Sequence, residues 1–225
     1  LHGEQDMRNM GGLRKAMPVT FWPMMISTLA IAGIFPFAGF WSKDEILMVA
    51  FEHNTDLWVI GSIASIMTAF YMFRLMIITF FGEPRNKEKY DHCHESPLQM
   101  TLPLIVLAIL SFFAFFSLNP FAADQGWFLK MVEMPESLLA GTKGAISHIL
   151  PVEEFMEQIH HAHYTAMFLS LAIAGLGILT AYTFYFWKKV SADKLADALK
   201  PLYNFSLNKW YFDELYDKTA VAATM

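Results

Sequence analysis

The stretch that decides the fold is residues 17–51, MPVTFWPMMISTLAIAGIFPFAGFWSKDEILMVAF. It is mostly apolar, and as one straight helix it would measure about 52 Å at 1.5 Å per residue. A hydrocarbon core of about 30 Å needs only roughly 20 residues. Gly33, Pro36 and Gly39 lie close together in its middle, and proline removes a backbone donor and clashes with the preceding turn. We therefore expect one bilayer-crossing segment that is broken near Pro36.

The residues after the break resemble a helix start. Ser42, followed three residues later by Glu45, has the spacing of a capping box. The pattern therefore predicts that a second helix begins near Ser42.

Lys43 follows this predicted start, and its depth in the bilayer is the main functional question. The apolar run after Lys43 ends at the polar residue Glu52, nine residues later. About 13 Å of helix therefore separates Lys43 from Glu52. That depth would place the ammonium inside the membrane, where a lysine is costly and suits a proton relay. Asp44 is its candidate charge partner. Alternatively, residues 18–41 alone cross the bilayer and Lys43 snorkels to the outer surface.

Three further apolar segments qualify as transmembrane helices, at residues 57–81, 98–118 and 164–187. Backbone groups in lipid must bond within their own segment, so helices are expected rather than open strands. The predicted fold class is an all-α integral membrane protein with four transmembrane helices, the first discontinuous, plus amphipathic surface helices.

Along the chain, the predicted loops are alternately rich and poor in Lys and Arg. They gather in residues 1–16, in the loop after residue 81 and in the tail from residue 190, whereas the two other loops hold few. The positive-inside rule places the basic loops on the cytoplasmic side of the membrane. Residues 119–163 then form an outer loop, for which we expect short amphipathic helices. In the tail, Ser191–Lys200 predicts a surface helix, and the sequence from Leu207 predicts the start of an interfacial helix.

Other polar residues in the spans are weaker candidates for a proton path. Arg74 lies eight residues before Gly82, so it either lines a path or snorkels to the cytoplasmic interface. Tyr71, with Thr68 and Thr79, either lines a hydrated path or makes helix contacts. Glu45 is the remaining candidate.

The composition excludes several function classes. Charged residues make up 16% of the chain and hydrophobic residues 55%, against about 25% charged in soluble domains. The net charge of −5, without a basic stripe, argues against nucleic acid. Cys93 is the only cysteine, so no intrachain disulfide forms. The histidine groups 92–94 and 160–163 match no zinc spacing, and no motif for NADH, flavin or iron–sulfur is present. We expect no metal and no cofactor in this chain.

Residues 1–15, LHGEQDMRNMGGLRK, are polar and lack the features of a signal peptide. We interpret them as an internal loop and the chain as a fragment of a longer protein.

Several blocks now carry a family resemblance: GEQDMRNMGGLRKAMPVTF, LAIAGIFPFAGFWSKDEIL, AFYMFRLMIITFFGEPR, HESPLQMTLPLIVLAILS and KWYFDELYDK. In this order they resemble the C-terminal part of subunit L, the antiporter-like subunit of proton-translocating NADH–quinone oxidoreductase (respiratory complex I). The resemblance covers essentially the whole chain, although residues 119–163 carry little of it.

This resemblance implies a proton-pumping membrane-arm subunit that does no redox chemistry itself, with other complex I subunits, lipid and protons as its partners. It implies that Lys43 and Asp44 belong to a proton path in the discontinuous helix. The alternative is a subunit of a multisubunit cation/proton antiporter or of a membrane-bound hydrogenase. A membrane scaffold with no proton path is a third possibility, and it requires Lys43 to be surface exposed.

Overall fold

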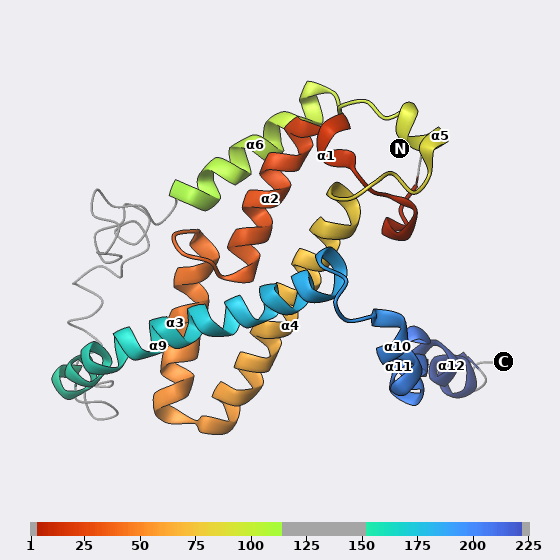
Figure 1. Cartoon of the computed structure of the whole chain (residues 1–225). Helices are drawn as coiled ribbons and strands as arrows, with labels where there is room; N and C mark the ends of the chain where they lie inside the picture. Colours follow the sequence, from red (N-terminus) through yellow and green to blue (C-terminus); the bar gives the residue numbers. More distant parts are fainter. Residues whose placement is uncertain (1–3, 114–151, 222–225) are drawn as a thin grey trace. The chain divides into compact units, whose positions relative to one another are not determined.

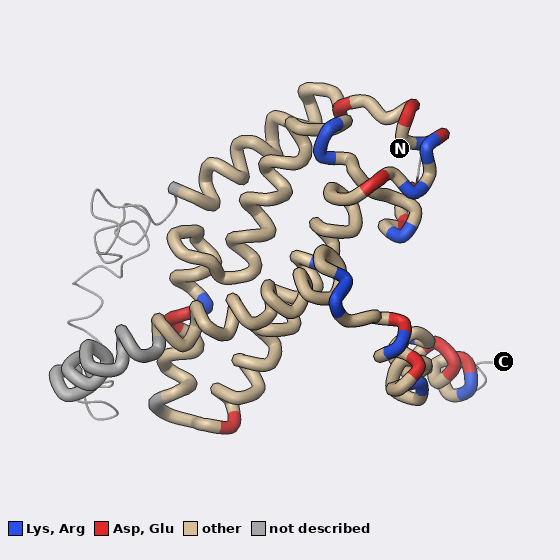
Figure 2. The backbone as a smooth tube through the Cα atoms, in the orientation of Figure 1, with Lys and Arg blue, Asp and Glu red and all other residues tan. Residues whose placement is uncertain are grey.

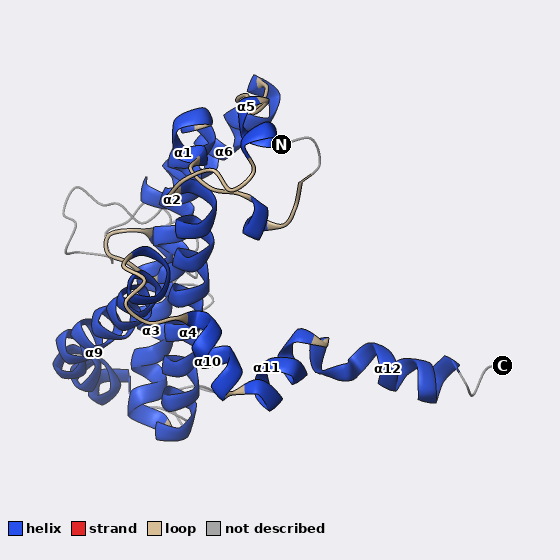
Figure 3. Cartoon of the chain, turned by 45° about the vertical axis from the view of Figure 1, so that its right-hand side comes forward, coloured by secondary structure: helices blue, strands red, loops and turns tan. Residues whose placement is uncertain are grey.

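The computed structural model describes residues 4–113 and 152–221. This part of the chain contains helices and connecting turns and no strand (Figure 3). The predicted all-α class is thereby confirmed for the described residues. The chain divides into two compact units, residues 1–182 and 183–225, and each is described by itself.

The first unit is built around long apolar helices (Figure 1). Its helical elements are η1 (Met7–Asn9), α1 (Leu13–Ala16), α2 (Pro18–Ala32), α3 (Ala38–His53), α4 (Thr55–Phe80), α5 (Lys87–Asp91), α6 (Leu98–Phe113) and α9 (Val152–Ala181). A π-helical turn, Tyr182–Phe186, follows α9. Helix α4 lies at the centre of the packing, with contacts to α2, α3 and α9, while α6 packs on α2.

The break predicted near Pro36 is present, and glycine rather than proline ends the first helix. Gly33 adopts the left-handed conformation, with φ of 80°. Its N–H donates to the Ala30 carbonyl, and the Ile34 N–H donates to the Leu29 carbonyl, the pattern of a Schellman C-cap. Helix α2 therefore stops at Ala32, four residues before Pro36.

The predicted capping box at Ser42 is wrong. Helix α3 begins at Ala38, with Phe37 in the extended N-cap position. Ser42 lies inside the helix, and its hydroxyl donates to the Gly39 carbonyl at 3.4 Å. The turn of residues 33–37 reverses the chain quickly enough for α3 to begin earlier. The Ser-x-x-Glu pattern thus falls within a helix, where it caps nothing.

The remaining predicted segments agree with the helices to different degrees. Helix α4 spans 55–80 and matches the segment 57–81. Helix α6 covers 98–113, and residues 114–118 lie outside the described part. Helix α9 begins at Val152, so residues 152–163 are helical and continue without a break into the segment predicted at 164–187. The amphipathic helices predicted in residues 119–151 also lie outside the described part.

Two described segments, Thr55–Phe80 and Met167–Phe186, are long and apolar enough to cross a bilayer, while residues 18–32 and 98–112 are apolar but shorter. Figure 2 shows that most Lys, Arg, Asp and Glu residues lie in the connections and in the tail, whereas α3 carries Lys43, Asp44 and Glu45 in its interior. Ile60, Ile63, Met67 and Tyr71 form an exposed apolar face on α4, as lipid or a partner helix requires.

The second unit is a run of short helices: α10 (Ala192–Ala198), α11 (Lys200–Leu207), η4 (Lys209–Tyr211), α12 (Phe212–Tyr216) and η5 (Asp217–Val221). Ser191 caps α10 by accepting from the Lys194 N–H at 3.3 Å, so the helix predicted at 191–200 is present. Helix α11 was not predicted. The exposed apolar side chains of this second unit include Trp187, Leu202, Trp210 and Tyr216.

Candidate functional site

The carbonyl end of α2 forms one side of the candidate site. The last four carbonyls of a helix have no partner in the helix itself and carry the negative end of its dipole. The turn at Gly33 satisfies those of Leu29 and Ala30. The Ile31 carbonyl accepts a hydrogen bond from Lys43 Nζ at 2.5 Å. The Lys43 side chain therefore reaches back from α3 to the broken end of α2.

Glycine makes this reach possible at two points. A Cβ at Gly39 would lie 2.0 Å from the Ala30 carbonyl oxygen, so only glycine lets α3 approach α2 this closely. A Cβ at Gly33 would lie 3.2 Å from Cδ of Lys43, so the lysine stem passes close over that glycine. The two glycines of the break thus position Lys43 as well as turning the chain.

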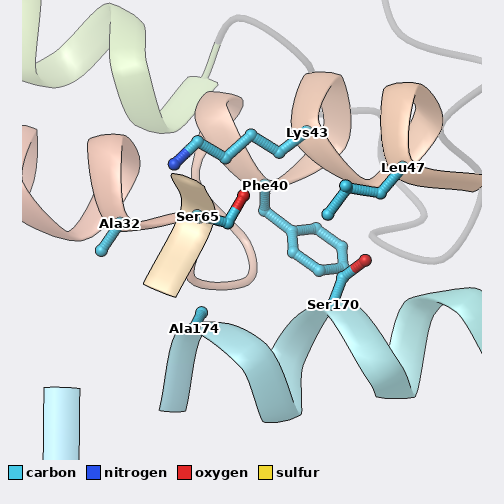
Figure 4. A pocket seen from close by; sticks show the side chains of 8 residues that line it. Ala32, Phe40, Lys43, Leu47, Ser65, Ser170 and Ala174 are labelled. Atoms are coloured by element: carbon cyan, nitrogen blue, oxygen red, sulfur yellow. The ribbon is translucent and has the colours of Figure 1, made fainter. Parts of the chain in front are cut away.

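A small pocket opens beside Lys43, where four segments meet (Figure 4). The space in it that water can occupy is about 10 Å³, room for about one water molecule. Its lining residues are Ala32, Gly33, Phe40, Lys43, Leu47, Ser65, Ser170 and Ala174. The polar side chains among them are one lysine and two serines, contributed by α3, α4 and α9. A lysine beside two hydroxyls in an apolar wall can exchange a proton with water held there.

The other predicted site residues lie elsewhere. Asp44 is buried, with 4% of its surface exposed, whereas Glu45 and Tyr71 are exposed and Arg74 is partly buried. None of these four lines the pocket in the described part of the chain. Of the predicted site residues, Lys43 is therefore the one that lines this pocket, together with Ser65 and Ser170.

Sequence reasoning missed these two serines. It considered Thr68 as a polar residue of the same helix, and the Thr68 hydroxyl donates to the Ala64 carbonyl at 2.7 Å inside α4. Hydroxyls in apolar spans are a visible signal, but only the packing of α3, α4 and α9 shows which of them face the lysine.

A carboxylate fixes the opposite end of α2. Met17, at the N-cap, offers no side-chain acceptor. Glu95 supplies one from 75 residues away: it accepts from the backbone N–H groups of Val19 at 2.8 Å and Thr20 at 3.1 Å, and from the Thr20 hydroxyl. Partial burial raises the pKa of Glu95, but these bonds and one from the Ser96 N–H outweigh it, so its pKa lies below the usual value.

Among the described residues, no group of three or more His, Cys, Asp or Glu side chains is placed to hold a metal ion. His92 and His94 are exposed, and Cys93 donates to the Lys89 carbonyl. The side chains of residues 160–163 lie outside the described part.

Comparisons with known proteins bear on this arrangement. Residues 1–70 match the family described as NADH:quinone oxidoreductase/Mrp antiporter, TM. The chain is 40% identical to the NAD(P)H-quinone oxidoreductase chain 5 of Picosynechococcus sp., covering 98% of this chain and 34% of that protein. It is 36% identical to the NADH-quinone oxidoreductase subunit L of Rhodobacter capsulatus, covering 96% of this chain and 38% of that protein.

A third relative, the NADH-quinone oxidoreductase subunit L of Rickettsia bellii, is 31% identical over 95% of this chain and 32% of its own length. The resemblance predicted from the sequence is confirmed by these relatives, and the chain is similar to proteins of a transmembrane family. It spans about a third of the length of the curated relatives that it matches.

Proposed function

We propose that this chain is part of a proton-translocating membrane subunit of an NADH:quinone oxidoreductase, in which Lys43 carries protons. The subunit lies in the inner membrane of a bacterium, beside other membrane-arm subunits of the complex. NADH oxidation and quinone reduction take place in those other parts, and this chain holds no cofactor. The similarity along nearly the whole chain to subunits with quinone oxidoreductase names supports this assignment.

In this proposal the membrane is crossed four times. Helices α2 and α3 together form one discontinuous crossing, and α4, α6 and α9 form the other three. Their apolar exposed faces and the charges gathered in the connections between them favour such an arrangement. Residues 1–16, the Arg85 loop and the tail then face the cytoplasm.

The hydrogen bond between Lys43 and the Ile31 carbonyl is the observation that carries the proton role. It holds the amine at the helix break, beside the serine-lined pocket, rather than letting it extend along α3 toward the polar end at His53. An ionisable group kept inside a membrane protein at this cost is expected to serve in transport. Asp44, buried on the next position of α3, is proposed to belong to the same path.

Two substitutions of Lys43 test this role in membrane vesicles that contain the intact complex. Lys43→Met removes the amine, and Lys43→Arg keeps a positive donor that does not deprotonate in proteins. Both are expected to stop NADH-driven proton uptake, measured with a pH-sensitive dye, while native gels still show an assembled complex. Lys15→Met, an exposed lysine in α1, is the matched control. Unchanged proton uptake in Lys43→Met would overturn the proposal.

A cation/proton antiporter is the second candidate, because the family description for residues 1–70 also carries the Mrp antiporter name. Proton exchange that depends on Na⁺ or K⁺ and needs no NADH would favour it. The same vesicles answer this question with NADH omitted and the cation added.

A further inference from the structure

Four lysines follow closely after an apolar segment, at the start of the second unit. Residues Met167–Phe186 are long and apolar enough to cross a bilayer, and Trp187 comes directly after them. The lysines that follow are all exposed: Lys188, Lys189, Lys194 and Lys200. None of their ammonium groups forms an ion pair within the described part of the chain, whereas Lys209 pairs with Asp213 at 3.5 Å. These four positive charges therefore remain available to a partner outside the chain.

Helix α10 sorts its apolar and acidic side chains onto opposite faces. Leu195 and, at the C-cap, Leu199 are four residues apart and share one face, with 46% and 50% of their surfaces exposed. Asp193 and Asp197 have the same spacing, and at about 100° per residue their face lies about 160° from that of the leucines. Lys194 falls between the two faces.

This order of charges fits the surface of a bilayer. A lysine at the border of an apolar face can lay its stem along the acyl chains while its ammonium reaches the headgroups. The leucines then enter the boundary between headgroups and acyl chains, and the two aspartates point away from the phosphates that would repel them. In a helix covered by protein, the charges would instead follow those of the partner surface.

The residues before α10 also suit a membrane interface. Trp187 is half exposed, and Nζ of Lys189 lies 5.7 Å from its ring centroid. Tryptophan and lysine side chains are typical of the ends of membrane segments. Only residues 187–191 separate Phe186 from the first residue of α10, Ala192, and this connection spans at most about 20 Å when fully extended. Helix α10 is therefore always within reach of the headgroups.

We propose that α10 and the four lysines around it bind the headgroups of anionic phospholipids. The proposal rests on the membrane location in the proposed function, and the role of Lys43 does not enter it. The competing explanation is that the lysines only orient the preceding segment during its insertion. That role needs positive charge but gives no later dependence on lipid composition, so the lipid is the variable to change.

Amide hydrogen exchange of α10, followed by mass spectrometry in the intact assembly that contains this chain, tests the binding. The assembly is reconstituted into vesicles of phosphatidylcholine alone, or of equal parts phosphatidylcholine and phosphatidylglycerol. We expect α10 to exchange at least about tenfold more slowly in the anionic vesicles, because each lysine near a negative surface contributes about fivefold. High salt should remove this difference in the unmodified protein, since it screens the charges.

A variant with glutamine in place of all four lysines should exchange equally fast in both kinds of vesicle. The matched control is Lys209→Gln with Lys218→Gln, which removes charge from the same unit and should keep the difference. Equal exchange of the unmodified protein in both lipids would overturn the proposal, as would an equal loss in the control. Protection that persists in detergent without lipid would also overturn it, because a protein partner would then cover the helix.

A native gel of the same membranes, stained for NADH oxidation, keeps this proposal apart from the proposed function. If the chain runs with the NADH-oxidising complex but α10 does not respond to lipid charge, only the lipid contact fails. If the chain runs outside that complex while α10 still responds, the proposed function fails and the lipid contact stands.

Discussion

Gly39 of α3 lies directly against the carbonyl of Ala30 in α2, so close that a Cβ at position 39 would be 2.0 Å from the oxygen and 2.8 Å from the carbon. The obstacle is backbone, which cannot turn aside as a side chain does. This contact sets how far α3 approaches the broken end of α2, and hence whether Lys43 reaches the Ile31 carbonyl.

Gly39→Ala is therefore expected to push α2 and α3 apart. Overpacking of this kind costs about 1–3 kcal/mol, and proton uptake should fall although Lys43 is intact. The matched comparison is Gly61→Ala, whose Cβ would meet only the flexible end of Leu47 at 3.0 Å. Thermal unfolding in detergent and proton uptake measure the two effects. A Gly39→Ala protein as stable as Gly61→Ala would contradict the prediction.

Gly177 marks the crossing of α9 over α4. A Cβ there would lie 2.5 Å from the Ile66 carbonyl oxygen and 2.8 Å from the Cβ of Ala69, as in the small-residue contacts of membrane helices. Gly177→Ala should destabilise the protein by about 1–3 kcal/mol. Gly175→Ala, two residues away with nothing within 4 Å, should instead stabilise it by about 0.5–1 kcal/mol. The same sign for both variants in thermal unfolding would refute this account of the crossing.

Glu95 makes stability depend on pH through the N-terminus of α2. Its pKa in the folded protein is below the usual value of 4.5, so its contribution is present above pH 4.5 and is lost as the pH falls through the lower folded value. Glu95→Gln should cost about 1 kcal/mol at neutral pH, as the loss of a helix cap does. The difference from the unmodified protein should vanish in acid.

Unfolding midpoints between neutral and acidic pH measure this effect, with Glu88→Gln, an exposed carboxylate on α5, as the control. A Glu95→Gln deficit that stays the same at every pH would show that the carboxylate charge is not the cause.

Arg14 connects α1 to two aromatic rings. Its guanidinium carbon lies 5.2 Å from the ring centroid of Phe21 and 5.6 Å from that of Phe81. A cation–π contact at an accessible site is worth about 0.5–1 kcal/mol, so Arg14→Gln should lower the free energy of unfolding by about that amount. Lys15→Gln is the control. A double-mutant cycle with Phe81→Leu should give a coupling energy, and additive effects would exclude the contact.

Much of the fold is predictable from the sequence, because hydrophobic runs and charge positions are local. The apolar segment 57–81 becomes α4, and the group of Gly33, Pro36 and Gly39 locates the break. The mistakes occurred at helix ends. The Ser42–Glu45 pattern suggested a cap, but α3 begins at Ala38, directly after the turn of residues 33–37.

The candidate site was predictable only in part. Lys43 stands out as an ionisable residue in an apolar stretch, so the local sequence alone identifies it. Its partners come from distant segments: the Ile31 carbonyl across the break, Ser65 from α4 and Ser170 from α9. Nothing in the local sequence distinguishes Ser65 from Thr68. Only the packing of α4 against its neighbouring helices decides that Ser65, and not Thr68, lines the pocket.

By itself, the sequence determined the helical class and the break in the first segment, and it singled out the lysine that we propose carries a proton. Hydrophobicity and the steric limits of glycine and proline act within a few residues, so a linear pattern records them. Only the tertiary structure decided that Glu95 caps α2 and that two serines border the lysine. Those contacts depend on which helix faces pack together. The packing in turn depends on close backbone contacts between residues far apart in the chain.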